Sequence, residues 1–193
     1  MNELFEKVVN PTFSKFQHEK YVEMELRLGK INRGSFDTNV GQSAFEKILR
    51  GLHKYKGWEK VTRVQDVAYY KDGIRLVINE DTDESVQVVK STIVKMNHTL
   101  ANKPLDVRFS VSREIPDSQE VDEFTCAKKR IRESFVRKNL SIDMTIVSGN
   151  PSDFDSEEES VYQIEFEIID PTKVRTKDEL FNIVYKIQNV LDI

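Results

Sequence analysis

Cysteine is almost absent from this chain of 193 residues, in which Cys126 is the one thiol. A disulfide framework is therefore excluded, and a reducing, intracellular compartment is expected. No apolar run approaches the roughly 20 residues that a membrane-spanning helix needs, so we expect no membrane association. The first ten residues contain two acidic residues and no apolar core of a signal peptide, and we expect a chain that is not secreted.

An excess of positive charge is also missing. The chain has 29 Lys and Arg against 33 Asp and Glu, which gives a net charge of −4. A module that binds a nucleic-acid duplex normally has a basic footprint, so any contact with nucleic acid is expected to be local, such as at one end of a strand. The sequence also lacks His-Glu-x-x-His, Gly-x-Ser-x-Gly, P-loop and Gly-x-Gly-x-x-Gly motifs, which argues against the chemistry that each of these supports.

Strand-like segments dominate what is present. Val, Ile, Phe, Tyr and Thr alternate with polar residues in eight segments, a pattern typical of half-buried strands. The segments span approximately 20–30, 58–70, 73–80, 86–97, 105–114, 124–136, 139–147 and 161–170. Between the second and third, Asp72-Gly73 predicts a tight hairpin turn. The predicted fold class is therefore mainly β.

Two helices are predicted, over about 43–55 and 177–191. Ser43 and Glu46 have the spacing of a capping box at the start of the first, and Thr176 and Glu179 have it at the start of the second. The second helix has an apolar stripe at helical spacing, which indicates packing against a core.

We expect one domain over residues 1–193, with the segment 1–19 and the C-terminal helix packed on its outside. The acidic stretch Asn150–Ser160 predicts a solvated loop between two strands.

Two Glu-x-Glu pairs lie on predicted strands far apart in the sequence. Glu23 and Glu25 share one face of the first strand, and Glu165 and Glu167 share one face of the last, each opposite apolar residues. Within a pair, the backbones of the two residues are about 7 Å apart. Four carboxylates brought together without a counterion would raise one another's pKa values. A hard divalent cation with oxygen ligands, Mg²⁺ or Mn²⁺, would remove that conflict.

The strands between these pairs place basic residues opposite their apolar faces. These residues are Arg75, Lys90, Arg108, Lys128, Arg130 and Arg132. If the sheet closes with its polar face inward, Arg and Lys would bind a polyphosphate and the acids would hold its metal. If the apolar face points inward instead, the same charges would lie in water, as in an ordinary antiparallel sheet.

At these residues the sequence resembles the triphosphate tunnel metalloenzymes, specifically the fungal and DNA-virus RNA triphosphatases of mRNA capping. The resemblance covers about 20–170 and rests on Glu23-x-Glu25-x-Arg27, Glu165-x-Glu167, Arg130-x-Arg132-x-Ser134 and Asp143-x-Thr145. It implies an eight-stranded antiparallel barrel with a hydrophilic interior and a few flanking helices. Gln163 stands where fungal members often have a third glutamate, and Ser141 stands where they tend to have a basic residue.

The resemblance also implies an activity, which is metal-dependent hydrolysis of the γ-phosphate from the 5′-triphosphate end of RNA, with Mg²⁺ or Mn²⁺ as cofactor. Nucleoside triphosphates are expected as further substrates in the presence of manganese. Glu23, Glu25 and Glu167, with Glu165 in or near the same shell, are the expected metal ligands. The basic residues named above are the expected phosphate ligands, and Arg130 and Arg132 join the four glutamates as catalytic candidates. The expected supporting residues are Arg27, Ser110, Asp143, Thr145 and Gln163.

The expected partners are triphosphate-ended RNA and nucleoside triphosphates. Because the chain has no guanylyltransferase motif, we expect a separate protein to supply the guanylyltransferase activity. A monomer is expected, acting in the nucleus or cytoplasm of a host if the source is viral. Two alternatives remain open. One is a tunnel-type phosphatase or cyclase acting on tripolyphosphate, thiamine triphosphate or ATP, and the other is a non-enzymatic β-domain that binds a phosphorylated partner.

Overall fold

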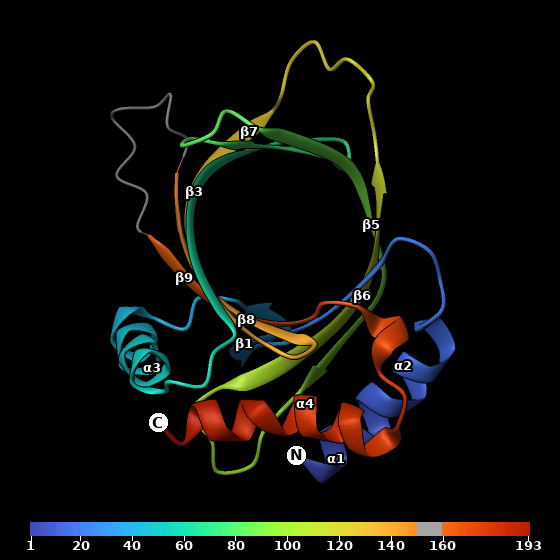
Figure 1. The fold of residues 1–193 in the computed structure, drawn as a ribbon, viewed down its shortest axis with the longest axis vertical. Coiled ribbons are helices and arrows are strands. Elements are labelled where there is room, and N and C mark those ends of the chain that lie inside the picture. The colour runs from blue at the N-terminus through green and yellow to red at the C-terminus, as the bar shows by residue number, and fades with distance from the viewer. Residues whose placement is uncertain (150–159) are drawn as a thin grey trace.

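The computed structural model describes residues 1–149 and 160–193 and consists of a closed antiparallel β-barrel with helices on one side (Figure 1). The strands are β1 (Val22–Asn32), β2 (Ser35–Asp37), β3 (Lys60–Lys71), β4 (Ile74–Asn79), β5 (Ser85–His98), β6 (Asp106–Pro116), β7 (Cys126–Arg137), β8 (Leu140–Ser148) and β9 (Val161–Ile168). All eight predicted strands are present, and the expected eight-stranded barrel is confirmed.

The barrel closes where the first strand meets the last. Around the barrel the order is β1-β6-β5-β4-β3-β7-β8-β9, and β9 then pairs with β1. The short strand β2 pairs with β1 alone and lies outside the barrel. Sequence analysis did not predict β2, because its three residues are too few to show a period of two.

The hairpin between β3 and β4 forms at the predicted position. Asp72 and Gly73 have φ values of 48° and 85°, so both central residues are in the left-handed region. This is the conformation of a type I′ turn, whose twist matches that of the flanking strands.

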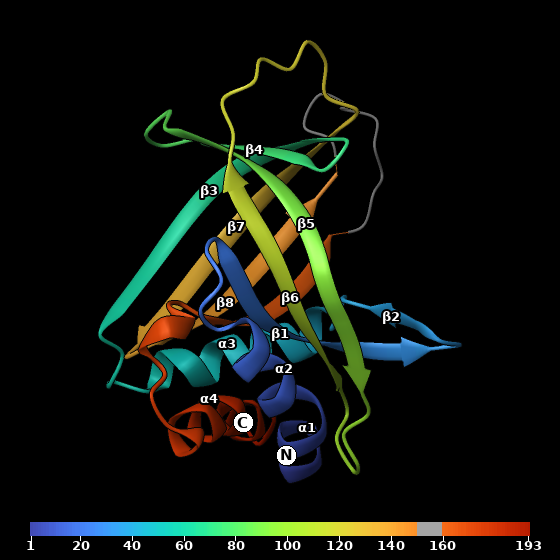
Figure 2. The ribbon, with the colours of Figure 1, turned by 90° about the vertical axis from the view of Figure 1, so that its right-hand side faces the viewer.

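The hydrophobic core lies outside the barrel, between its lower strands and the helices. We call β1, β6, β8 and β9 the floor, and β3, β4, β5 and β7 the roof (Figures 1 and 2). The floor strands direct their apolar side chains downward, where Met24, Leu26, Phe109 and Phe166 are fully buried. Phe135, at the end of the roof strand β7, joins the same core. Each such side chain contributes roughly 1.5–3 kcal/mol on burial.

Helices complete this core from below. They are α1 (Asn2–Leu4), a π-helical turn (Phe5–Val9), α2 (Asn10–Phe16), α3 (Gln42–Lys54), a 3-10 turn (Pro171–Lys173) and α4 (Lys177–Leu191). Phe5 and Phe13 come from the N-terminal segment, Phe45 from α3, and Val184 and Ile187 from α4. The N-terminal segment and the C-terminal helix thus pack on the outside of the barrel. Because the helices supply the core, the barrel interior is not needed for packing and can be polar.

The two predicted capping boxes have different outcomes. At α4 the box forms, since the Glu179 backbone N–H donates to Thr176 Oγ1 at 3.1 Å and the Thr176 N–H donates to Glu179 Oε2 at 3.3 Å. At α3 the prediction is wrong. That helix begins at Gln42 with Gly41 as its N-cap, so Ser43 lies inside the first turn and Glu46 accepts from Gln42 Nε2 at 2.8 Å instead.

Among the described residues, no helix has the length and apolar character needed to cross a membrane. The acidic stretch predicted as a loop, apart from Ser160 at its end, lies outside the described residues.

Candidate active site

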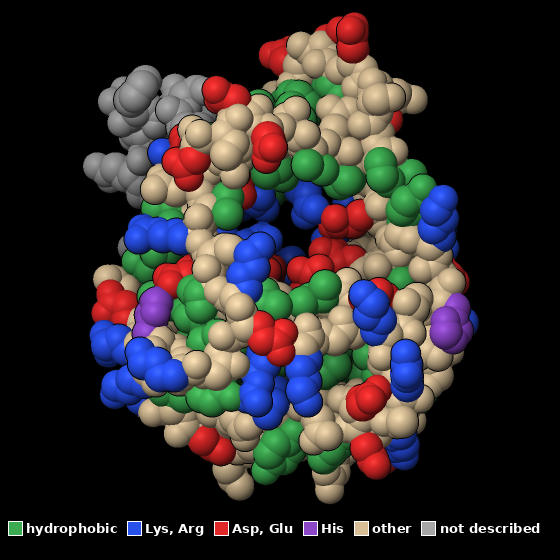
Figure 3. Space-filling view, in the orientation of Figure 1, with side chains coloured by type: hydrophobic (Ala, Val, Ile, Leu, Met, Phe, Trp, Pro, Cys, Tyr) green, Lys and Arg blue, Asp and Glu red, His purple; other side chains and the backbone are tan. Residues whose placement is uncertain are grey.

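A cavity of about 400 Å³ occupies the barrel interior. Viewed along the barrel, it is a hollow surrounded by acidic and basic side chains (Figure 3). Its charged lining residues are Glu23, Glu25, Arg27, Asp66, Arg75, Lys90, Lys128, Arg130, Arg132, Glu165 and Glu167. The polar faces of the strands therefore point inward. Of the two arrangements that the sequence allowed, polar face inward or apolar face inward, the structure has the first.

The two Glu-x-Glu pairs meet where the barrel closes. Glu25 lies directly opposite Glu167 in the β1–β9 register, and Arg27 lies opposite Glu165. Residues at opposite positions of an antiparallel pair have Cβ atoms about 5 Å apart, so these carboxylates come from neighbouring backbone positions. Glu25 and Glu167, which are 142 positions apart in the sequence, thus belong to one acidic patch on the floor of the cavity.

Arg27 forms ion pairs with two of these carboxylates. Its Nη2 donates to Glu25 Oε2 at 3.1 Å and lies 2.9 Å from Glu165 Oε1, while its Nε lies 3.0 Å from Glu25 Oε1. Burial opposes the charge of Arg27, but Glu165 and Glu25 outweigh burial and raise its pKa. Burial also raises the pKa of Glu25, since Arg27 only partly offsets the loss of water and the repulsion from Glu165 and Glu23.

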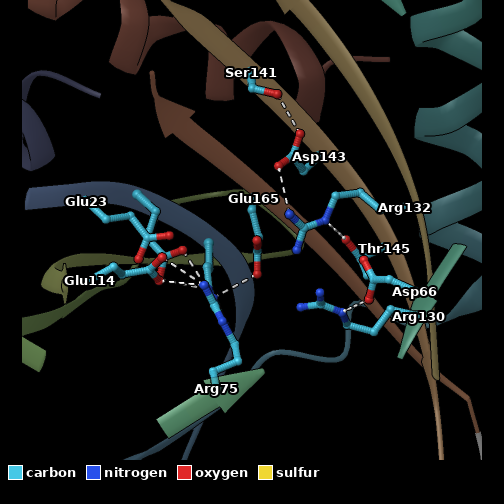
Figure 4. A network of polar contacts seen from close by, with 12 residues as sticks. Glu23, Asp66, Arg75, Glu114, Arg130, Arg132, Ser141, Asp143, Thr145 and Glu165 are labelled. Carbon is cyan, nitrogen blue, oxygen red and sulfur yellow. Dashed lines mark hydrogen bonds and ion pairs between the residues drawn. The ribbon is translucent and has the colours of Figure 1, made fainter. Parts of the chain in front are cut away.

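Glu23 belongs to a second network, which reaches the strands β4 and β5 (Figure 4). It accepts from Ser112 Oγ at 2.8 Å and forms an ion pair with Lys90. Lys90 also lies 2.8 Å from Glu114 Oε1, and Glu114 accepts from Arg75 Nη2 through both oxygens at 2.8 Å. Burial alone would raise the pKa of Glu23, but Lys90 and the hydrogen bonds keep it below its ordinary value.

Two further cations of the cavity, Arg130 and Arg132, come from β7 (Figure 4). Arg130 Nε donates to Asp66 Oδ1 at 2.5 Å, and both side chains are buried. Arg132 Nε donates to Thr145 Oγ1 at 3.3 Å, and its Nη1 lies 3.7 Å from Asp143 Oδ2. Burial disfavours the charged form of Arg132, yet Glu165 and Asp143 raise its pKa. Both guanidinium groups are therefore held on defined partners.

Glu167 differs from the other three glutamates. Within the described residues, no hydrogen bond or ion pair neutralises it. Burial, followed by repulsion from Asp143 and Glu23, raises its pKa to about 7. In the part of the chain that the structure describes, the four glutamates of the acidic patch therefore outnumber the two cations that pair with them, Arg27 and Lys90.

This excess fits a divalent cation. Glu23, Glu25 and Glu167 supply oxygen donors, which suit Mg²⁺ or Mn²⁺. The described residues contain no ready-made group of three acidic side chains in metal-binding geometry, because Arg27 and Lys90 engage two of the glutamates. A cation would have to draw these carboxylates away from their present partners.

The cavity also contains a donor with no acceptor in the described part of the chain, Arg75 Nε, which is buried. An unpaired buried N–H costs free energy, and an anionic ligand in the cavity would satisfy it. This observation fits a phosphate near Arg75.

Sequence reasoning placed most of its candidates correctly with respect to the cavity. Three candidates lie beside it rather than on it. Ser110 is buried opposite Glu25, Asp143 holds Arg132, and Arg108 lies opposite Arg27. The catalytic, metal-binding and phosphate-binding roles assigned to all these candidates remain predictions.

Two acidic residues of the networks were missed. Glu114 is one alternation step beyond Ser112 on β6, so extending the polar face by two residues would have found it. Asp66 shares the inward phase of β3 with Tyr70, and its partner Arg130 lies directly opposite it on β7. That pairing could not be found without the register of the two strands.

Comparisons with known proteins agree with this geometry. The family model for the beta chain of the mRNA capping enzyme matches residues 52–183, more than half of the chain. Glu165 and Glu167 lie within the matched segment, whereas Glu23 and Glu25 precede it and join the site through the β1–β9 register. Comparison with curated protein sequences gives no significant match.

Solved structures share the fold at low sequence identity. The S. pombe Pct1 RNA triphosphatase is 15% identical with a TM-score of 0.80, over 96% of this chain and 91% of that one. The RNA triphosphatase domain of the mimivirus mRNA capping enzyme is 14% identical with a TM-score of 0.65, over 100% and 99% of the two chains. The chain belongs to the family of mRNA capping enzyme beta chains, the RNA triphosphatases of the triphosphate tunnel type.

Proposed function

We propose that this protein hydrolyses the γ-phosphate from the 5′-triphosphate end of RNA, the first step of mRNA cap formation, in a metal-dependent reaction. The observation that carries the proposal is the division of charge inside one closed cavity. Four glutamates lie on β1 and β9, and five of the six arginines and lysines lie on β4, β5 and β7, while Arg27 on β1 and Asp66 on β3 pair with charges of the opposite sign. A triphosphate with a bound divalent cation has the complementary division of charge.

The cations would bind the β- and γ-phosphates. Arg75, Arg130 and Arg132 come from different strands, so they can contact different oxygens of a polyphosphate. Each is held by an acidic or hydroxyl partner before substrate arrives, which reduces the reorganisation needed on binding. Lys90 and Lys128 would add positive charge to the same cavity.

Glu23, Glu25 and Glu167 would hold Mg²⁺ or Mn²⁺, with Glu165 in or near the first shell. When bound, that cation would offset charge on the phosphate oxygens and act as a Lewis acid. Glu165, already held by Arg27, can accept a proton or a hydrogen bond from the attacking water. Asp143 orients Arg132, and Ser112 orients Glu23, so both keep groups of the site in place.

The proposed reaction is an in-line attack of water on the γ-phosphorus, with the β-phosphate as leaving group. The arginines would stabilise charge on the equatorial oxygens of the transition state. Nothing in this scheme needs a covalent enzyme intermediate. Nucleoside triphosphates present the same triphosphate, and we propose that they are hydrolysed in the presence of manganese.

The test is alanine replacement of Glu25 and of Glu167, with release of γ-phosphate from triphosphate-ended RNA as the readout. Each variant is expected to lose at least about 100-fold in turnover, since a charged group at the reacting centre is removed. Glu46→Ala on the exposed face of α3 is the matched control and should retain full activity. Turnover near that of the wild type in both tunnel variants would refute the site.

The family assignment favours this enzyme over a non-enzymatic phosphate-binding domain. A small polyphosphate as the true substrate is tested by competition between triphosphate-ended RNA and tripolyphosphate in magnesium. We further propose action as a monomer inside the cell, with a separate guanylyltransferase completing the cap.

A further inference from the structure

Over the part of the chain that the structure describes, the two ends of the tunnel differ in charge. At one end, which we call the loop mouth, residues 80–84 join β4 to β5, and four of the five are exposed acidic residues. At the other end, which we call the hairpin mouth, β1 continues into β2, and Arg27 and Arg108 lie opposite each other. Figure 2 shows the loop and the β1–β2 hairpin projecting at opposite ends of the barrel. Arg27 is already paired with Glu25 and Glu165, so Arg108 is the one of the two that can attract a further anion. Among the described residues, a polyanion is therefore repelled at the loop mouth and meets the charge of Arg108 at the hairpin mouth.

A β-bulge brings further polar side chains to the hairpin mouth. The register between β5 and β6 shifts between Thr92 and Val94. Before the shift Lys90 faces the cavity, and after it Lys95 and Asn97 lie opposite Ser110 and Arg108 instead. One inserted residue changes which side chains point toward the tunnel, as bulges do elsewhere.

The side chain of Arg108 is held in a defined orientation by a hydrogen bond and by an aromatic ring. Its Nε donates to Asn97 Oδ1 at 2.9 Å, and its guanidinium lies 4.5 Å from the centre of the Phe36 ring. The Phe36 ring in turn covers Gly29, where an added Cβ would come within 2.6 Å of the ring. Gly29 thus permits the close approach of Phe36, and Phe36 and Asn97 together fix the orientation of Arg108.

Arg108 has no ion-pair partner among the described residues, whereas Arg75 and Arg130 each have one and Arg27 has two. Burial and then the neighbouring charge of Arg27 lower its pKa, and Glu25 only partly compensates. Arg108 does not line the cavity in which the triphosphate would lie. Within residues 1–149 and 160–193, it is thus an oriented cation without an acidic partner, just outside that cavity.

We infer that Arg108 binds a backbone phosphate of the RNA strand just beyond its 5′-triphosphate, and that the strand leaves the tunnel through the hairpin mouth. The inference rests on the proposed function and adds a determinant of substrate class. Groups inside the cavity contact only the triphosphate, which RNA ends and free nucleotides share. Arg108 contacts a phosphodiester, which a free nucleotide lacks.

The experiment compares Arg108→Ala with the wild type on two substrates, triphosphate-ended RNA of about ten nucleotides and ATP. Loss of one charge-assisted phosphate contact is expected to lower kcat/KM for RNA about tenfold. For ATP, kcat/KM should stay within about twofold. The dependence of log kcat/KM for RNA on log salt should become shallower by about 0.7, the value for one phosphate of a single strand.

Arg63→Ala is the matched control, because Arg63 is an exposed arginine on the outward face of β3. It should leave both substrates and the salt dependence unchanged. Equal losses on RNA and ATP in Arg108→Ala would overturn the inference, since they would place Arg108 at the triphosphate. Unchanged values for both would overturn it too. Failure of the proposed function itself would be visible separately, as a wild-type protein that releases no phosphate from RNA ends.

Discussion

Glu25 and Glu167 lie directly opposite each other across the β1–β9 pairing that closes the barrel. Closure of the sheet and assembly of the acidic patch are therefore the same event. A chain in which β9 fails to pair with β1 would lose both the barrel and the candidate metal ligands.

The metal-free protein is expected to lose stability as pH rises through about 7. The pKa of Glu167 is raised to about 7 in the folded protein from an ordinary value of 4.5. Its stabilising effect as a neutral acid is complete below the unfolded value and disappears as pH passes the folded value. Between pH 5 and 8 we expect a loss of about 2 kcal/mol in the free energy of unfolding, measured by urea denaturation in a chelator.

Glu167→Gln is the control for that measurement, because it replaces the acid by a neutral group of the same shape. Its free energy of unfolding should change less over the same pH range. Added Mn²⁺ should raise the Tm of the wild type at pH 8 and have a smaller effect on Glu167→Gln. Parallel pH profiles for the two proteins would contradict the assignment.

Arg27→Ala is expected to destabilise the fold as well as remove activity. It leaves Glu25 and Glu165 charged and close together inside the barrel. Removing one partner of a buried ion pair costs several kcal/mol, and with partial access of water to Arg27 we expect about 2 kcal/mol. Thermal unfolding measures this, and Arg27→Lys, which keeps the charge but not the planar fork, should recover part of the loss. A Tm equal to that of the wild type in Arg27→Ala would show that the pair is not stabilising.

Phe166→Ala tests the position of the core. Phe166 is fully buried below the floor, so its truncation is expected to cost about 3–5 kcal/mol. Glu167→Gln alters the next residue, whose side chain points into the tunnel, and should cost far less in the same denaturation experiment at pH 6. Similar losses in the two variants would contradict a core confined to one face of β9.

Thr176→Ala removes the side-chain cap of α4 and should lower the free energy of unfolding by about 1 kcal/mol. Ser43→Ala is the matched control. Ser43 resembles a cap in the sequence but lies within the first turn of α3, so its replacement should change stability by less than about 0.5 kcal/mol. Comparable effects in chemical denaturation would mean that the start of α3 differs from the one described.

The alternation of the strands was sufficient to predict the barrel strands and the acidic and basic faces, because a period of two is local information. Contacts that depend on register could not be predicted in this way. The pairing of Asp66 with Arg130 needs the alignment of β3 with β7, and Asn97 reaches Arg108 only because a bulge interrupts β5. The position of Arg108 outside the cavity likewise follows from barrel geometry rather than from sequence spacing.

The core below the floor has a consequence for how the protein can change. Along β1, Met24, Leu26 and Leu28 are packed against helices, while Glu23, Glu25 and Arg27 line the cavity. A substitution scan over residues 23–28 should give alternating phenotypes, with folded but inactive variants at Glu23 and Glu25 and poorly folded ones at Met24, Leu26 and Leu28. Arg27 is intermediate, because its loss removes activity and also part of the stability. Selection for a new polyphosphate substrate can act on every second residue of the floor while the residues between them preserve the fold.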